Sequence, residues 1–168
     1  MKKVGLLLSF ASLLGTHAFL FQNARGVWEP SEGRYVCVAM QMVRSGQWLT
    51  PHLNDDLPHW TKPPLTYWSL AASLTLFGKN EFAVRFPNAL AYLLTLALMF
   101  FLGRIFTPAR PWMPTIIYGT FLLPFVCSNV ITTDGLLAFF ETAAMAGFAS
   151  AYLHPGIFFK RWGVSAGW

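Results

Sequence analysis

The sequence is short of charged residues and of cysteine. Only 11% of its 168 residues are Asp, Glu, Lys or Arg, against about 25% in an ordinary soluble domain. Together with a hydrophobic content of 55%, this excludes an intrinsically disordered chain and argues against a water-soluble domain. Cys37 and Cys127 stand far apart, without Cys or His at metal-binding spacing, so neither a zinc site nor a disulfide framework is predicted.

Long basic runs are also missing. The net charge is +5, but the Lys and Arg residues are scattered along the chain, so no nucleic acid partner is expected. The mean hydropathy of +0.46 instead indicates a protein embedded in membrane lipids.

Four apolar stretches are predicted to cross the membrane, at residues 4–21, 86–105, 112–131 and 135–153, because about 20 apolar residues span the hydrocarbon. The first has an alternative interpretation as a signal peptide with a weak cleavage site at Thr16-His17-Ala18. Residues 65–78 are apolar but too few to span, and Tyr67 and Trp68 favour a helix in the headgroup layer.

The predicted fold class is therefore an all-α integral membrane protein, a single membrane domain with about four transmembrane helices. Its first outer loop, residues 22–85, is expected to carry juxtamembrane amphipathic helices. Residues 154–168 are expected to form a cytoplasmic tail that is truncated.

Charge asymmetry predicts the orientation. With the N-terminus in the cytoplasm, the inner segments carry six positive charges and no acid. These charges are Lys2, Lys3, Arg104, Arg110, Lys160 and Arg161. The positive-inside rule then places residues 22–85 and the 132–134 loop on the outer face of a bacterial-type plasma (inner) membrane.

The first candidate carboxylate is Glu32. An amphipathic helix is predicted over residues 32–45, with Ser31 as its N-cap, Gly46 at its end, and Val36, Met40 and Val43 on its apolar side. Glu32 is either a first-turn acid that favours the helix dipole or a catalytic group.

Further candidates flank the membrane. Pro63 and Pro64 stiffen the loop that presents Lys62 at the membrane edge, where Lys62 either snorkels to water or binds a ligand. Asp134 opens the fourth helix, as a cap or as a reactive acid. Glu141 lies two turns further inside the bilayer, which marks a functional site by default, although a hydrogen-bonded structural glutamate is the favoured alternative.

Five of these ionisable residues are expected to converge on the outer surface. They are Glu32, Arg34, Lys62, Arg85 and Asp134. Cations at a membrane interface suit a lipid-linked phosphate, and a carboxylate can accept a proton from an attacking hydroxyl. A divalent cation bound by the carboxylates is left open.

Ordered motifs between residues 29 and 134 go beyond composition. They are Glu29–Tyr35, Gly46–Asn54, Lys62–Trp68, Leu76–Pro87 and the Thr133-Asp134 pair. On these motifs the chain resembles the N-terminal part of the GT-C fold polyprenyl-phosphate-sugar glycosyltransferases, in the superfamily of aminoarabinose transferases and protein O-mannosyltransferases.

The resemblance implies an enzyme that transfers a hexosyl or pentosyl group from a polyprenyl-phosphate-linked sugar to a lipid, protein or glycan acceptor on the outer face. By position it places Glu32 and Arg34 at the site, with Glu32 or Asp134 as the catalytic carboxylate that activates the acceptor hydroxyl. Lys62 and Arg34, joined by Arg85, would bind the donor phosphate.

Two positions depart from the family pattern. Ser31 stands where members commonly carry an acid, and Thr61 stands where many carry Glu. The resemblance also covers only the front portion of such an enzyme. The alternative interpretation is therefore a non-catalytic, truncated membrane protein that binds a lipid carrier or a partner subunit.

Overall fold

The computed structural model describes residues 16, 18–19, 22–23, 26–28, 30–54 and 57–153. Six helices follow one another in this part of the chain: α2 (Ser31–Ser45), α3 (Pro64–Phe77), α4 (Glu81–Phe106), α5 (Met113–Thr120), α6 (Leu122–Ser128) and α7 (Asp134–Leu153). Strands β1 (His52–Asn54) and β2 (Leu57–Pro58) form a short antiparallel hairpin between α2 and α3. Helices otherwise dominate, which confirms the all-α fold class.

Helix α2 starts differently from the prediction. Pro30, not Ser31, is its N-cap residue, and no side chain caps it from that position. Instead the carboxylate of Glu32 accepts a hydrogen bond at 2.7 Å from the backbone N–H of Trp28. The helix ends as predicted at Gly46, whose φ of 71° is a left-handed conformation that glycine adopts without steric cost.

The buried side of α2 agrees only in part with the predicted one, since Val36 and Val43 are partly buried and pack against the core. Val38, Ala39 and Met42 are fully buried, whereas Met40 is 38% exposed. Glu32 belongs to the buried side too. Ile131 and Arg85 hold Glu32 in the interior and thereby set the rotation of α2 about its axis. The spacing of hydrophobic residues alone does not reveal this rotation.

Helix α3 packs against this buried side. Tyr67, Leu70, Ala71 and Leu74 form one hydrophobic core with Val38, Ala39 and Met42 of α2. The indole N–H of Trp68 donates to the carbonyl of Trp48 at 2.6 Å and ties α3 to the segment after α2. Pro64 opens α3, where its missing N–H costs nothing.

A serine accommodates the proline inside α4. Pro87 cannot donate to the carbonyl of Ala83 one turn earlier, which leaves that carbonyl without its helical partner. The hydroxyl of Ser73 in α3 donates to this carbonyl at 2.5 Å. The helix therefore continues through the proline, and α3 is fastened to the first turns of α4.

The predicted span 112–131 is divided in the structure. Helices α5 and α6 are separated at Phe121, which has an extended backbone with φ −67° and ψ 131°. Pro124 explains the break, because its ring would clash with the carbonyl of Thr120 in a continuous helix. Within the described residues, α4 and α7 are the two helices long and apolar enough to cross a membrane. Most of the predicted span 4–21, and the tail 154–168, lie outside the described residues.

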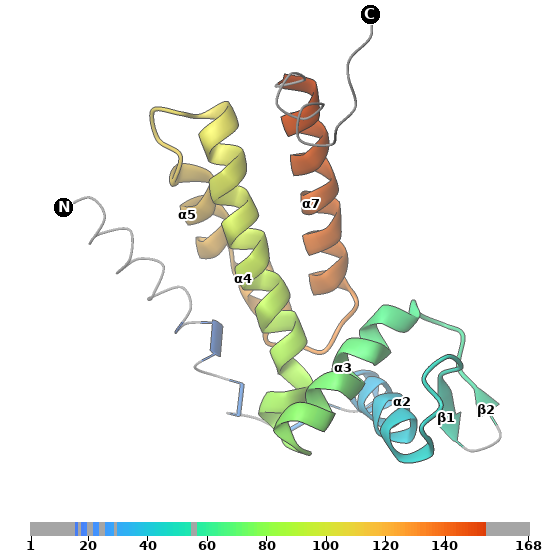
Figure 1. The fold of residues 1–168 in the computed structure, drawn as a ribbon. Coiled ribbons are helices and arrows are strands. Elements are labelled where there is room, and N and C mark those ends of the chain that lie inside the picture. Colours follow the sequence, from blue (N-terminus) through green and yellow to red (C-terminus); the bar gives the residue numbers. More distant parts are fainter. Residues whose placement is uncertain are drawn as a thin grey trace, which may run out of the picture.

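Figure 1 shows α4 and α7 side by side, with α2 and α3 packed across one end of α4. The loop between α6 and α7 returns to this same end. The polar segments that carry the candidate residues are therefore gathered at one end of the long helices.

Candidate functional site

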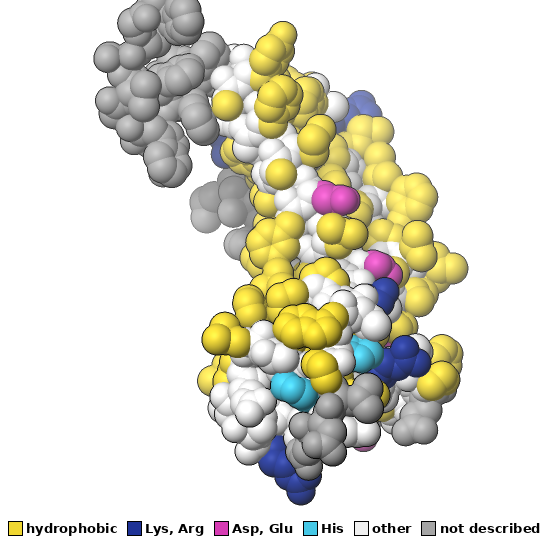
Figure 2. Space-filling view, turned by 90° about the vertical axis from the view of Figure 1, so that its right-hand side faces the viewer, with side chains coloured by type: hydrophobic (Ala, Val, Ile, Leu, Met, Phe, Trp, Pro, Cys, Tyr) yellow, Lys and Arg dark blue, Asp and Glu magenta, His cyan; other side chains and the backbone are white. Residues whose placement is uncertain are grey.

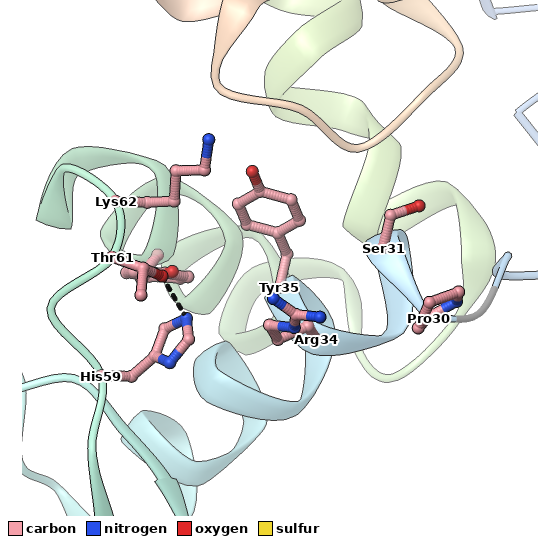
Figure 3. A pocket seen from close by; sticks show the side chains of 8 residues that line it. Pro30, Ser31, Arg34, Tyr35, His59, Thr61 and Lys62 are labelled. Carbon is pink, nitrogen blue, oxygen red and sulfur yellow. Dashed lines mark hydrogen bonds between the residues drawn. The ribbon is translucent and has the colours of Figure 1, made fainter.

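A pocket of about 280 Å³ opens between α2 and the segment that leads into α3. Figure 3 shows the α2 residues on one side of it and the residues of the 59–62 segment on the other. The lining consists of Pro30, Ser31, Arg34, Tyr35, His59, Thr61, Lys62 and Tyr67.

Two cations face this pocket from different elements. Arg34 projects from the first turn of α2, and Lys62 comes from the loop that Pro63 and Pro64 stiffen. Both are exposed, so their charges are free to meet a ligand from solvent or from the membrane surface. The structure thus brings together two of the residues expected to bind phosphate.

Aromatic rings and hydroxyl groups complete the lining. The rings of Tyr35 and Tyr67 lie 5.9 Å apart, and His59 meets the ring of Tyr67 edge-on at 6.0 Å. The hydroxyl of Thr61 shares a 2.7 Å hydrogen bond with Nε2 of His59. Burial raises the pKa of Tyr67, although its hydrogen bond with Thr61 and the nearby charge of Arg34 act in the opposite direction. Tyr67 is therefore a neutral phenol at neutral pH.

No carboxylate lines the pocket among the residues that the structure describes. Ser31 and Thr61, which stand where the resembled family carries acids, contribute hydroxyl groups instead. The described lining therefore combines two cations with several neutral hydrogen-bonding groups.

Glu32 points away from this pocket into the interior. It is fully buried, and its Oε1 accepts a hydrogen bond at 2.9 Å from the backbone N–H of Ile131. Its Oε2 accepts from Trp28 and lies 3.7 Å from Nη2 of Arg85. Both carboxylate oxygens are thus engaged in joining α2 to α4 and to the loop before α7.

Arg85 is the buried partner of Glu32 and is also fully buried. Its Nη1 donates to the carbonyl of Gln22 at 2.6 Å, and its Nη2 donates to the carbonyl of Gly26 at 2.9 Å. The expectation that Glu32 and Arg85 meet a ligand beside Arg34 and Lys62 therefore differs from their placement here. Their charges are directed at backbone groups and at each other.

Asp134 is exposed at the start of α7. It lies on a second cavity of about 270 Å³ between α4, α6 and α7, which Asn88, Tyr92, Tyr118 and Cys127 also line. Its backbone N–H donates to the hydroxyl of Thr132 at 3.3 Å, so Asp134 is held by a turn while its carboxylate stays accessible.

Asn88 holds the loop that presents Asp134. Its side-chain amide donates to the carbonyls of Val130 and Thr132, at 2.5 and 3.2 Å. The sequence interpretation missed this residue, as it missed Tyr35, His59 and Tyr67. The available signals were the position of Asn88 one turn after Arg85 and the inclusion of Tyr35 and Tyr67 in the family motifs.

The remaining expectations concern Glu141 and a metal. Glu141 is exposed on α7. In the part of the chain that the structure describes, no three His, Cys, Asp or Glu side chains gather as a metal site would require. The divalent cation left open by the sequence therefore has no ligand cluster there.

Comparison of the sequence with models of known protein families assigns the chain to a family. Residues 61–167 match the model of the dolichyl-phosphate-mannose-protein mannosyltransferase family. The chain belongs to this family. The match begins next to Lys62 and includes Arg85 and Asp134.

Curated relatives extend the likeness to the first loop. An undecaprenyl phosphate-alpha-4-amino-4-deoxy-L-arabinose arabinosyl transferase of Proteus mirabilis is 33% identical over 145 residues, covering 85% of this chain and 26% of the relative. One from Shewanella sediminis is 37% identical over 135 residues, covering 78% and 24%. The chain therefore spans about a quarter of the length of these relatives.

Solved structures agree. ArnT from Cupriavidus metallidurans in the apo state matches with a TM-score of 0.83 at 24% identity, covering 90% of this chain and 28% of that one. The same protein bound to undecaprenyl phosphate matches with a TM-score of 0.72 at 26% identity, covering 88% and 27%. These matches confirm the resemblance drawn from the motifs and the assignment as an integral membrane protein.

Proposed function

We propose that this chain forms the donor-binding front portion of a membrane glycosyltransferase that uses a polyprenyl-phosphate-linked sugar. The observation that carries the proposal is the pocket that Arg34 and Lys62 both line, with no carboxylate among its described lining residues. Such a lining suits the phosphate of a lipid carrier at the membrane edge. The arabinosyl transferase relatives, and the related structure bound to undecaprenyl phosphate, support this ligand class.

In this proposal the two cations bind the donor phosphate and stabilise it as it departs. The acceptor hydroxyl attacks the anomeric carbon, the bond from that carbon to the phosphate oxygen breaks, and the polyprenyl phosphate leaves. Negative charge grows on the phosphate during this step, and preorganised cations stabilise that change. Tyr67, a neutral phenol, supplies a hydrogen-bond donor beside them.

Asp134 is the proposed base that takes the proton from the acceptor hydroxyl, because its carboxylate is accessible. Glu32 and Arg85 have a different proposed role. The hydrogen bond from Ile131 to Glu32 fixes the loop just before Asp134, and Arg85 balances the buried charge of Glu32. Glu32 thus positions the loop without touching the acceptor.

The proposed site faces the outer side of a bacterial-type inner membrane, with the N-terminus in the cytoplasm. The clustering of positive charge in the inner segments supports this orientation. The acceptor is proposed to be a lipid, protein or glycan that approaches from the outer side, where Asp134 is accessible.

Binding of undecaprenyl phosphate to the chain in lipid nanodiscs tests the donor site. Lys62→Ala is expected to weaken binding about tenfold, because it removes one charge-assisted contact with the phosphate. Lys79→Ala is the matched control, since Lys79 is exposed but lies outside the pocket lining. If Lys62→Ala and the wild-type chain bind undecaprenyl phosphate with equal affinity, the pocket is not the binding site of the donor phosphate.

The second candidate function is a carrier-binding membrane protein without transferase activity. The replacement of two family acids by Ser31 and Thr61 favours it, because the pocket then binds the phosphate without offering a base. Transfer assays in membranes with a polyprenyl-phosphate sugar separate the two functions. Activity that is lost in Asp134→Asn, with donor binding retained, supports the transferase.

A further inference from the structure

Helix α7 leaves one long face uncovered. Five large apolar side chains on this face are between 50% and 75% exposed: Leu137, Phe140, Met145, Phe148 and Tyr152. Only 6% of the most apolar 18-residue stretch of α7 is buried, against 33% for α4. At about 100° per residue, positions 137, 140, 145, 148 and 152 fall within less than half of the helix circumference, so these side chains lie along one side of the helix.

A carboxylate lies in the middle of this face. Glu141 is exposed and falls between Leu137 and Met145, whereas Ala146, the buried residue of α7, is on the opposite side. None of the described residues forms an ion pair or a hydrogen bond with the side chain of Glu141. Figure 2, which views the molecule from the α7 side, shows acidic side chains among hydrophobic ones.

The position of Glu141 makes lipid a poor neighbour for it. It lies seven residues from Asp134, which is about 10 Å along the helix axis and thus below the membrane rim where α7 begins. A carboxylate facing hydrocarbon is strongly unfavourable unless a cation or hydrogen-bond donor meets it. The exposed face of α7 is therefore poorly suited to contact lipid alone, because Glu141 needs a cation or a hydrogen-bond donor beside it.

The other described segments leave this face of α7 exposed. Helices α4 and α6 contact the other side of α7. Ala18 and Phe19, at the end of the first apolar stretch, pack with Tyr92, Leu96 and Tyr118 on α4 and α5. In the related ArnT structures, by contrast, this chain covers only 28% and 27% of the solved chain, so most of that related fold is additional polypeptide.

We propose that the face of α7 formed by Leu137, Glu141, Met145, Phe148 and Tyr152 binds a membrane-spanning helix from polypeptide beyond these 168 residues. That helix carries a Lys or Arg opposite Glu141, with apolar side chains above and below it. Charge complementarity within hydrocarbon selects this occupant over lipid. Asp134 lies two turns before Glu141 on α7, so the bound helix runs near the accessible carboxylate.

Synthetic spanning helices test this surface without the natural partner. The full chain is placed in lipid nanodiscs with a labelled Leu/Ala-rich peptide that carries one Lys about two turns below its outer end. A second peptide has Leu in place of that Lys. The Lys peptide is expected to bind about tenfold more tightly than the Leu peptide, and this preference is expected to disappear in Glu141→Gln.

Two further variants locate the effect. Ala144→Trp, which places a bulky ring on the same face, is expected to block both peptides. Leu90→Ala, on the exposed surface of α4, is the control and is expected to retain the preference. Because Glu141, Ala144 and Leu90 all lie outside the lining of the proposed donor pocket, undecaprenyl phosphate binding is expected to stay unchanged in these variants, which separates this result from the proposed function.

Equal binding of the two peptides to the wild-type chain would overturn the proposal, as would a Lys preference that survives in Glu141→Gln. Self-association of the chain in nanodiscs that is lost in Glu141→Gln would also overturn it, because the occupant would then be a second copy.

Discussion

Arg85 and the pair Arg34 and Lys62 carry the same charge in opposite surroundings. Arg85 lies in the interior, where backbone carbonyls and Glu32 surround it. Arg34 and Lys62 lie open on the pocket, with no carboxylate in its described lining. A cation whose partners belong to the protein stabilises the fold, whereas a cation without such partners is available to a ligand.

The largest expected effect on stability comes from Glu32→Ala. This change leaves Arg85 buried without its counter-charge and frees the N–H groups of Trp28 and Ile131. Breaking a buried pair by removing one partner costs about 3–5 kcal/mol. Chemical unfolding in detergent micelles, followed by tryptophan fluorescence, measures the free energy of unfolding. A decrease in the free energy of unfolding of less than about 1 kcal/mol would mean that the buried pair of Glu32 and Arg85 does not stabilise the fold.

A smaller loss is expected from Ser73→Ala, because Ser73 supplies the hydrogen bond that Pro87 denies to Ala83. Leaving that carbonyl unpaired costs about 1–3 kcal/mol. In Pro87→Ala the helix regains its own donor, so the same serine change should then cost much less. A double-mutant cycle measures this coupling, and purely additive effects would contradict the account.

The smallest change in stability is expected for Arg34→Ala, which removes an exposed side chain from the pocket rim. Its free energy of unfolding should stay within about 0.5 kcal/mol of wild type. Its affinity for undecaprenyl phosphate should nevertheless fall about tenfold, since a charge-assisted contact is lost. The free energy of unfolding and the affinity in nanodiscs are measured on one preparation of the variant. An Arg34→Ala variant that is clearly less stable but binds undecaprenyl phosphate normally would show that Arg34 stabilises the fold and does not bind the ligand.

Local sequence signals predicted the end of α2, where Gly46 has a left-handed conformation. The short apolar helix was predicted over residues 65–78, and α3 forms over Pro64–Phe77, so Pro64 belongs to the helix and not to the loop. Pro124 marks the break between α5 and α6, although hydropathy alone made one span of residues 112–131. These features depend on a few neighbouring residues, which is why a sequence displays them.

The interior role of Glu32 could not be predicted in this way. Its partner N–H belongs to Ile131, which is 99 residues away, and Arg85 comes from a third segment. A first-turn glutamate looks the same in sequence whether it faces water or the interior. The convergence of Arg34 and Lys62 was predicted from the topology that places both on the outer side. The separate cavity beside Asp134, by contrast, depends on how α4, α6 and α7 pack.

The hydrogen bond between Ile131 and Glu32 involves the main chain of Ile131 and not its side chain. Glu32 accepts a hydrogen from the peptide group and ignores the identity of the side chain attached to it. Every amino acid except proline has a backbone N–H that can donate this hydrogen bond at position 131. The connection between the first loop and α7 can therefore persist through extensive sequence change, while leaving little trace in a comparison of side chains.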